Sequence, residues 1–168
     1  MKWNFFLAPT LALASATTAA ACEGRFYDYS AYAPSDLREF SYGIRVDTQK
    51  EEIWIGHSGQ KIRLCGEDSP FYCIHSLALN FAVPKASPKD GKVWSSGGME
   101  FHLEGTETLN VLGESVKVLV VSAKDGVREH RYFYSEDRGL LGIVTIDKSK
   151  DNAYKTVFLL EQKSGFPF

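Results

Sequence analysis

The residues of this 168-residue chain that could do chemistry stand apart from one another in the sequence. A histidine can act as a general base near neutral pH, and the chain has four of them: His57, His75, His102 and His130. None has a serine, cysteine or carboxylate at a spacing that marks a catalytic pair, because such partners usually meet only in the folded protein. The sequence therefore predicts no catalytic residue and no cofactor.

Two short segments match known functional motifs only in part. The run Gly56-His57-Ser58-Gly59-Gln60 begins like the nucleophile elbow of hydrolases, but that motif needs a second glycine where Gln60 stands and a helix after it. The loop over 147–152 places oxygen ligands like a calcium loop, but Asn152 and Phe158 replace its glycine and glutamate. We interpret both segments as turns between strands.

The three cysteines indicate an oxidised protein. Cys65 and Cys73 are separated by seven residues, whereas zinc sites usually use closer pairs such as Cys-x2-Cys. We therefore expect a Cys65–Cys73 disulfide and no metal site built from these cysteines with His75 or His57. Cys22 is the odd cysteine, and it is either free, disulfide-bonded or modified.

The binding surface that the sequence favours lies along a single strand. Because alternate residues of a strand face the same way, one face would carry a row of four residues that suit binding. Arginine and tyrosine offer a large contact area to a flat ligand, a sugar or a partner protein. For these residues we nevertheless favour cross-strand pairing of the aromatic side chains within the sheet, and binding is the alternative. The four residues are Arg128, His130, Tyr132 and Tyr134.

The N-terminus predicts export. Lys2, an apolar run over 5–14 and small residues before Cys22 are typical of a bacterial-type signal peptide over 1–21. The sequence Ala-Ala-Ala-Cys that ends at Cys22 permits either ordinary cleavage or lipidation of the cysteine, which would anchor the protein to a membrane. We expect a protein of the periplasm or outer envelope, or a secreted one.

The remaining residues, 22–168, predict a single domain of mainly β structure. They are long enough to bury a substantial core without help from a metal. Lys2 is the only charged residue of the signal, so the mature chain is one unit more negative than the −2 of the whole sequence. This charge gives no reason to expect a nucleic-acid partner.

The first part of this domain predicts separate elements. We expect a hairpin whose turn lies at Ser58-Gly59-Gln60, and a long loop in the segment richest in proline and glycine. We also expect at most one short helix, capped by Ser35. The expected elements are an N-terminal arm over 22–34, the helix over 35–40, strands over 52–57, 61–65 and 77–83, and the loop over 84–98.

The second part predicts an antiparallel meander most clearly. Its apolar runs are joined by short turns, such as Asp125-Gly126 and the turn ending at Gly139, where glycine permits a positive φ. The run over 116–122 begins half-exposed and ends apolar on both faces, so we expect a curved sheet, half-barrel or small barrel. The expected runs are 99–104, 108–112, 116–122, 127–135, 140–147 and 154–161.

These observations favour an envelope-associated binding or accessory domain without catalysis. It would bind a small ligand or an envelope protein through a sheet face or the Cys65–Cys73 loop, with membrane contact only through a lipid on Cys22. Two alternatives remain open: an exported hydrolase whose site is assembled from scattered residues, and a small secreted inhibitor or immunity-type protein.

The first testable prediction is that the chain is processed at or just before Cys22. The intact mass of the protein from the envelope fraction should lack residues 1–21, and an added diacylglycerol would identify the lipid-anchored form. A mature protein that still carries Met1 would contradict the prediction.

Overall fold

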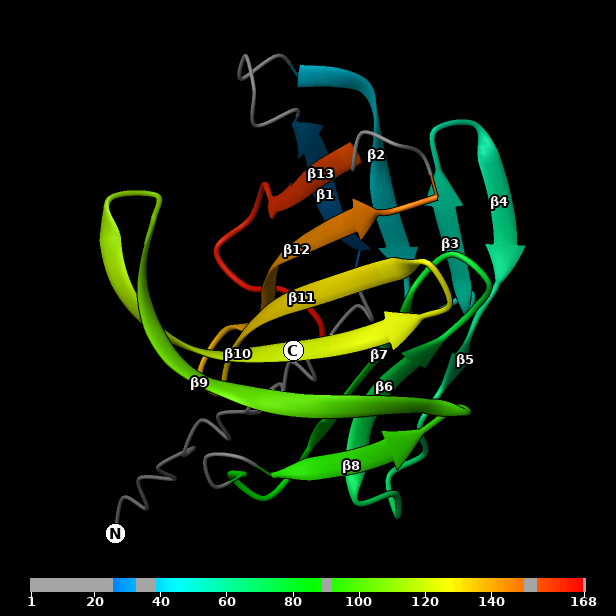
Figure 1. Cartoon of the computed structure of the whole chain (residues 1–168). Coiled ribbons are helices and arrows are strands. Elements are labelled where there is room, and N and C mark those ends of the chain that lie inside the picture. The colour runs from blue at the N-terminus through cyan, green and yellow to red at the C-terminus, as the bar shows by residue number, and fades with distance from the viewer. Residues whose placement is uncertain (1–25, 33–38, 89–91, 150–153, 168) are drawn as a thin grey trace, which may run out of the picture.

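The described part of the chain consists of β-strands joined by turns and loops. The computed structural model describes residues 26–32, 39–88, 92–149 and 154–167, and within them the strands form a ten-stranded and a three-stranded antiparallel sheet (Figure 1). The expected mainly β fold is therefore confirmed. Nowhere in these ranges is there a helix long and apolar enough to cross a membrane.

The large sheet is strongly curved but open. Its strands are β1 (Phe26–Tyr32), β2 (Glu39–Asp47), β3 (Glu52–Ile55), β4 (Ser58–Lys61), β8 (Val93–Ser96), β9 (Met99–Val111), β10 (Glu114–Asp125), β11 (Arg128–Ser135), β12 (Gly139–Asp147) and β13 (Tyr154–Leu160). Their order is β4-β3-β2-β1-β13-β12-β11-β10-β9-β8. The edge strands β4 and β8 do not pair with each other, so the sheet does not close into a barrel.

The small sheet packs against one face of the large sheet and shares its core. It consists of β5 (Arg63–Leu64), β6 (Phe71–His75) and β7 (Asn80–Pro84), in that order. Phe81 of β7 is fully buried, and its ring lies 5.2 Å from that of Tyr132 on β11. Tyr132 also donates its hydroxyl to the Asn80 carbonyl over 2.6 Å, which fixes where the two sheets meet.

The C-terminal meander forms as the sequence predicts, except that the runs expected over 99–104 and 108–112 form one strand, β9, because its pairing with β10 continues through a β-bulge between them. Strands β9 to β13 are neighbours in chain order, and β10 is buried on one face at Val116 but on both faces by Val120 and Val121. Gly139 has a φ of 74°. A Cβ at Gly139 would also lie 2.4 Å from the Gly165 carbonyl oxygen, so the C-terminal segment packs directly on this turn.

Several expectations for the first half are wrong. Residues 26–32, expected in an N-terminal arm, form β1 between β2 and β13, because Tyr27, Tyr29 and Ala31 alternate into the core. The hairpin turn lies at Gly56-His57, since Ser58-Gly59-Gln60 belongs to β4.

Three further strands, β2, β6 and β8, were not expected. Two other expectations differ from the structure or fall outside its described residues. The loop over 84–98 contains β8, which completes the large sheet, and β6 begins inside the cysteine loop and continues past Cys73 to His75. The strand expected over 77–83 begins only at Asn80, while Leu77 lies in the preceding turn and is 95% exposed. Residues 39–40 of the expected helix belong to strand β2 instead, because this strand pairs with β1. Residues 35–38 lie outside the described residues, as do the signal peptide and Cys22.

The Cys65–Cys73 disulfide is confirmed. It joins β6 to the segment that follows β5, with Cα atoms 5.2 Å apart. Cys73 is buried and belongs to the shared core, so the bond ties the irregular loop between these strands to the centre of the protein.

Replacing Phe81 with alanine should destabilise the protein by about 3 to 5 kcal/mol, because it leaves a cavity between the two sheets. Phe26→Ala is the matched control, since Phe26 is 44% exposed and should cost less than about 1 kcal/mol. Urea unfolding followed by circular dichroism measures both values. An equal decrease in the free energy of unfolding for the two variants would show that the interface between the sheets is not the main core.

Candidate functional site

The strand face favoured by the sequence is only partly accessible. Arg128, His130, Tyr132 and Tyr134 do share one face of β11, but Tyr132 is 0% and Tyr134 is 3% exposed. Both rings pack against Phe81, because the small sheet covers this half of the face. Burial raises the pKa of both tyrosines well above the usual range. The four residues therefore do not form an exposed patch, and cross-strand packing explains the two tyrosines.

Arg128 and His130 lie on the uncovered half of the same face, where they line a cavity of about 250 Å³. The His130 Nδ1 atom lies 3.1 Å from the Thr145 hydroxyl, and the Arg128 Nε atom lies 3.5 Å from the Asp147 carboxylate. Burial lowers the pKa of His130, which favours the neutral imidazole. This small cavity could hold only a small apolar group beside these polar side chains.

A larger hollow lies on the opposite face of the large sheet, over β1, β2 and β3. This groove has a volume of about 840 Å³. Because Tyr27 and Tyr29 of β1 point into the core, Asp28 between them faces the groove. Sequence reasoning missed the groove, since it assigned residues 26–32 to an arm.

A row of flat side chains crosses the floor of the groove. Asp28, Arg45 and Trp54 are cross-strand neighbours on β1, β2 and β3. Arg45 donates to both carboxylate oxygens of Asp28, over 2.6 and 3.1 Å, and this hydrogen bond raises the pKa of Arg45. Its guanidinium also lies 5.9 Å from the centre of the Phe26 ring. The ion pair thus holds Arg45 beside the exposed ring of Phe26, with Trp54 as its cross-strand neighbour on β3.

Gly59 on β4 explains the position of Trp54. A Cβ at this glycine would lie 3.0 Å from the indole ring, so the absence of a side chain lets the ring rest on β4. Trp54 remains 41% exposed. The groove therefore presents a fixed aromatic surface to solvent.

The polar lining of the groove is mainly acidic. The carboxylates of the lining outnumber its cationic groups. One of these carboxylates, Glu161, accepts a hydrogen bond from the Ser30 hydroxyl. Lys50 lies 3.8 Å from Asp47, and Lys61, outside the lining, lies 3.1 Å from Glu52. The charged lining residues are Asp28, Arg45, Asp47, Lys50, Glu52 and Glu161.

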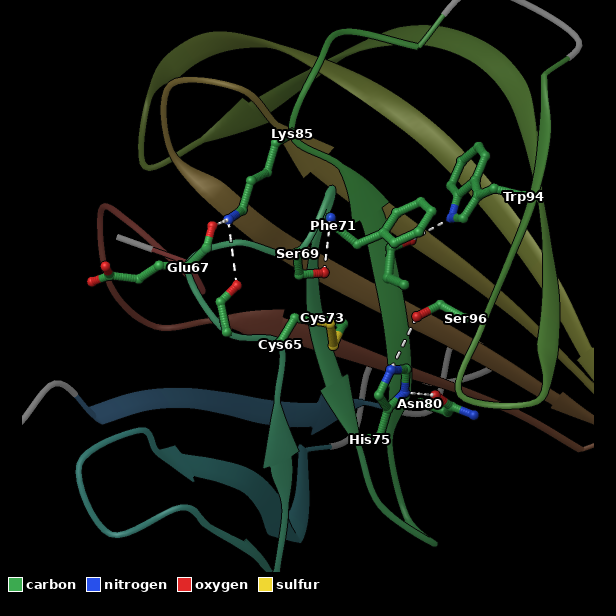
Figure 2. Close-up of a disulfide and its surroundings, with 12 residues drawn as sticks. Cys65, Glu67, Ser69, Phe71, Cys73, His75, Asn80, Lys85, Trp94 and Ser96 are labelled. Atoms are coloured by element: carbon green, nitrogen blue, oxygen red, sulfur yellow. Dashed lines mark hydrogen bonds between the residues drawn. A yellow bond between two sulfur atoms is a disulfide. The ribbon is translucent and has the colours of Figure 1, made fainter.

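A third group of polar side chains lies beside the disulfide, where the small sheet meets β8. Figure 2 shows His75 between Asn80 and Ser96, with hydrogen bonds to both. Asn80 lies 5 residues and Ser96 lies 21 residues after His75 in the sequence, so no local motif marks the group. The sequence analysis found no partner for any of the four histidines, but in the fold His75 is hydrogen-bonded to a serine, Ser96.

The same region brings together the cysteines and the histidine that were considered for a metal. Ligand atoms of Cys65, Cys73 and His75 lie within 4.8 Å of one another. Metal binding by cysteine requires the thiolate, and the disulfide removes both thiolates. In this oxidised form the three residues do not provide a metal-binding set.

The remaining sequence candidates lie in turns or on exposed strand positions. His57 is in the exposed hairpin turn after Gly56, and strand β4 rather than a helix follows it. His102 is exposed and lies 2.9 Å from Glu100. Asp147 accepts the Ser149 backbone N–H over 2.9 Å, while residues 150–153 lie outside the described residues.

Comparison of the chain with protein-family models, curated proteins and solved structures finds no match. The function must therefore be argued from the sites themselves.

His130 should titrate below its ordinary pKa of 6.5 in the folded protein, because burial disfavours the imidazolium. The unfolded chain then binds a proton more readily, so stability should fall as the pH drops through about 6.5 towards the folded pKa. Proton NMR of the histidine ring measures the pKa, with His130→Gln providing the assignment. A pKa at or above 6.5 would contradict the prediction, as would an unchanged pH dependence of stability in His130→Gln.

Proposed function

We propose that this protein is an exported binding domain that holds a neutral oligosaccharide in the groove over β1, β2 and β3. The observation that carries the proposal is the exposed row of Phe26, Arg45 and Trp54 on the groove floor. The protein would act in the periplasm, in the outer envelope or outside the cell.

The shape and lining of the groove favour a polar ligand. Sites for apolar small molecules are usually enclosed and mostly apolar, with only a few polar groups. This groove is open to the surface, and nine of its fourteen lining residues are charged or carry a hydroxyl group. A ligand that fits must therefore carry many hydrogen-bonding groups.

A sugar satisfies both the polar and the aromatic parts of the lining. The C–H bonds of a sugar ring form a flat apolar face that packs on an exposed indole, while the hydroxyl groups lie around its edge. Trp54 is held against Gly59 and presents such a face. The carboxylates of Asp28 and Glu52 lie near enough in the same lining to accept hydrogen bonds from sugar hydroxyls.

The charge of the lining favours a neutral sugar over an acidic one. Four carboxylates face only two cationic side chains in the groove, so phosphorylated or carboxylated polymers would be repelled. Arg45 and Lys50 lie beside Asp28 and Asp47 and offset those two carboxylates. Glu52 and Glu161 therefore give the lining its excess negative charge, with Glu52 also beside Lys61 outside the lining. A nucleic acid is disfavoured for the same reason.

Export is supported by the predicted signal peptide and by the disulfide. Disulfides persist in oxidising compartments and are rare in the cytosol. The Cys65–Cys73 bond therefore agrees with a periplasmic or secreted protein, whether or not Cys22 carries a lipid.

The proposal predicts that Trp54→Ala weakens oligosaccharide binding about thirtyfold, because removal of an aromatic anchor costs about 2 kcal/mol. An array of neutral and acidic oligosaccharides would first identify a ligand, and calorimetric titration would then compare the variants. Val127→Ala is the control, since Val127 is 54% exposed and does not line the groove.

Val127→Ala should keep the thermal midpoint nearly unchanged because Val127 is largely exposed, and Trp54→Ala should lower it only modestly because the indole lies on β4 and not in the core. The proposal would be wrong if the array showed no neutral oligosaccharide bound. Equal affinity of the wild type and Trp54→Ala would also exclude the groove as the site.

A further inference from the structure

A hydrogen-bonded chain of three side chains connects the small sheet to the edge of the large sheet. The Ser96 Oγ atom lies 3.1 Å from His75 Nε2, and His75 Nδ1 lies 2.5 Å from Asn80 Oδ1 (Figure 2). His75 ends β6, Asn80 begins β7 and Ser96 ends β8. All three side chains are half-buried, so solvent reaches the group.

The hydrogen bonds fix the state of the imidazole. The Asn80 amide oxygen can only accept, so His75 Nδ1 carries the proton, and Nε2 is left with a lone pair that accepts the Ser96 hydroxyl proton. The Asn80 amide nitrogen in turn lies 3.5 Å from the Gly97 carbonyl oxygen, which agrees with this orientation of the amide. A serine, a basic imidazole and a group that orients it are the parts of a nucleophilic triad.

The turn that follows Ser96 supplies the remaining part. Gly97 and Gly98 have φ angles of 60° and 78°, and in the described residues neither backbone N–H donates to another backbone group. Two free N–H groups directly after a nucleophile can stabilise the negative oxygen of a tetrahedral intermediate. A Cβ at Gly97 would lie 2.2 Å from His75 Nδ1, so only glycine lets the turn pack against the imidazole. A Cβ at Gly98 would meet nothing within 4 Å, which leaves room for a substrate.

We propose that Ser96, His75 and Asn80 form an acyl-transfer site that hydrolyses carboxylic esters. Ser96 Oγ attacks the ester carbonyl carbon while its proton passes to His75 Nε2. The carbon–oxygen bond to the alcohol then breaks, and the alcohol leaves with that proton. Water, activated by His75, cleaves the acyl–serine bond, releases the acid and restores the Ser96 hydroxyl.

The surroundings of the site favour small esters over amides. Ser96 and the glycine turn lie at the surface, so little binding energy is available to help break a bond to a poor leaving group. This site is separate from the groove, and its activity does not depend on oligosaccharide binding.

The test is labelling of the oxidised mature protein with a fluorophosphonate, followed by peptide mass spectrometry. The probe should attach to Ser96, and it should not attach to Ser95. Ser95 is the matched control, because it is the exposed neighbour on the opposite face of β8. Absence of label from Ser96 in the wild-type protein would overturn the proposal.

Hydrolysis of p-nitrophenyl acetate provides the second measurement. Ser96→Ala should lower the rate at least about 100-fold, while Ser95→Ala should stay within about twofold of the wild type. His75→Gln should lose the label although Ser96 is still present, with circular dichroism checking that the fold is retained. An unchanged rate in Ser96→Ala would show that the three side chains only join the sheets.

Discussion

The position of the small sheet on the large sheet depends on the burial of Phe81. Its ring is fully enclosed and lies 5.2 and 6.0 Å from the rings of Tyr132 and Tyr134. Burying β7 also removes its carbonyl groups from water, and an unpaired buried carbonyl is costly. Tyr132 donates to the Asn80 carbonyl, and the Trp94 indole donates to the Ala82 carbonyl over 3.1 Å. Apolar burial therefore holds the sheets together, while these two hydrogen bonds fix their register.

This packing decides where a ligand can be bound. The small sheet covers the half of the β11 face that holds Tyr132 and Tyr134, and the large hollow lies on the other face of the large sheet, over β1, β2 and β3. The same packing carries the ends of β6 and β7 to the end of β8. His75 meets Ser96 there because Phe81 and the Cys65–Cys73 bond hold both small-sheet strands in place.

The accuracy of the sequence-based expectations differs between the two halves of the chain. In the second half, long alternating runs separated by Asp-Gly and Gly139 turns specify neighbouring strands by local chemistry alone. In the first half, β6 and β8 have only five and four residues, too few for an alternating pattern to stand out from the surrounding loops. Strand β1 was missed because aromatic residues occur on both of its faces, although Tyr27 and Tyr29 alternate into the core.

The sequence by itself determined the antiparallel meander, the positive φ at Gly139 and the Cys65–Cys73 pair. These depend on residue type and on neighbours close along the chain. Only the tertiary structure decided which face of β11 is covered, that Trp54 and Arg45 share a groove, and that Ser96 meets His75. The two faces of a strand are equivalent until another layer packs on one of them. Contacts between distant residues likewise depend on how that layer packs, which no local pattern encodes.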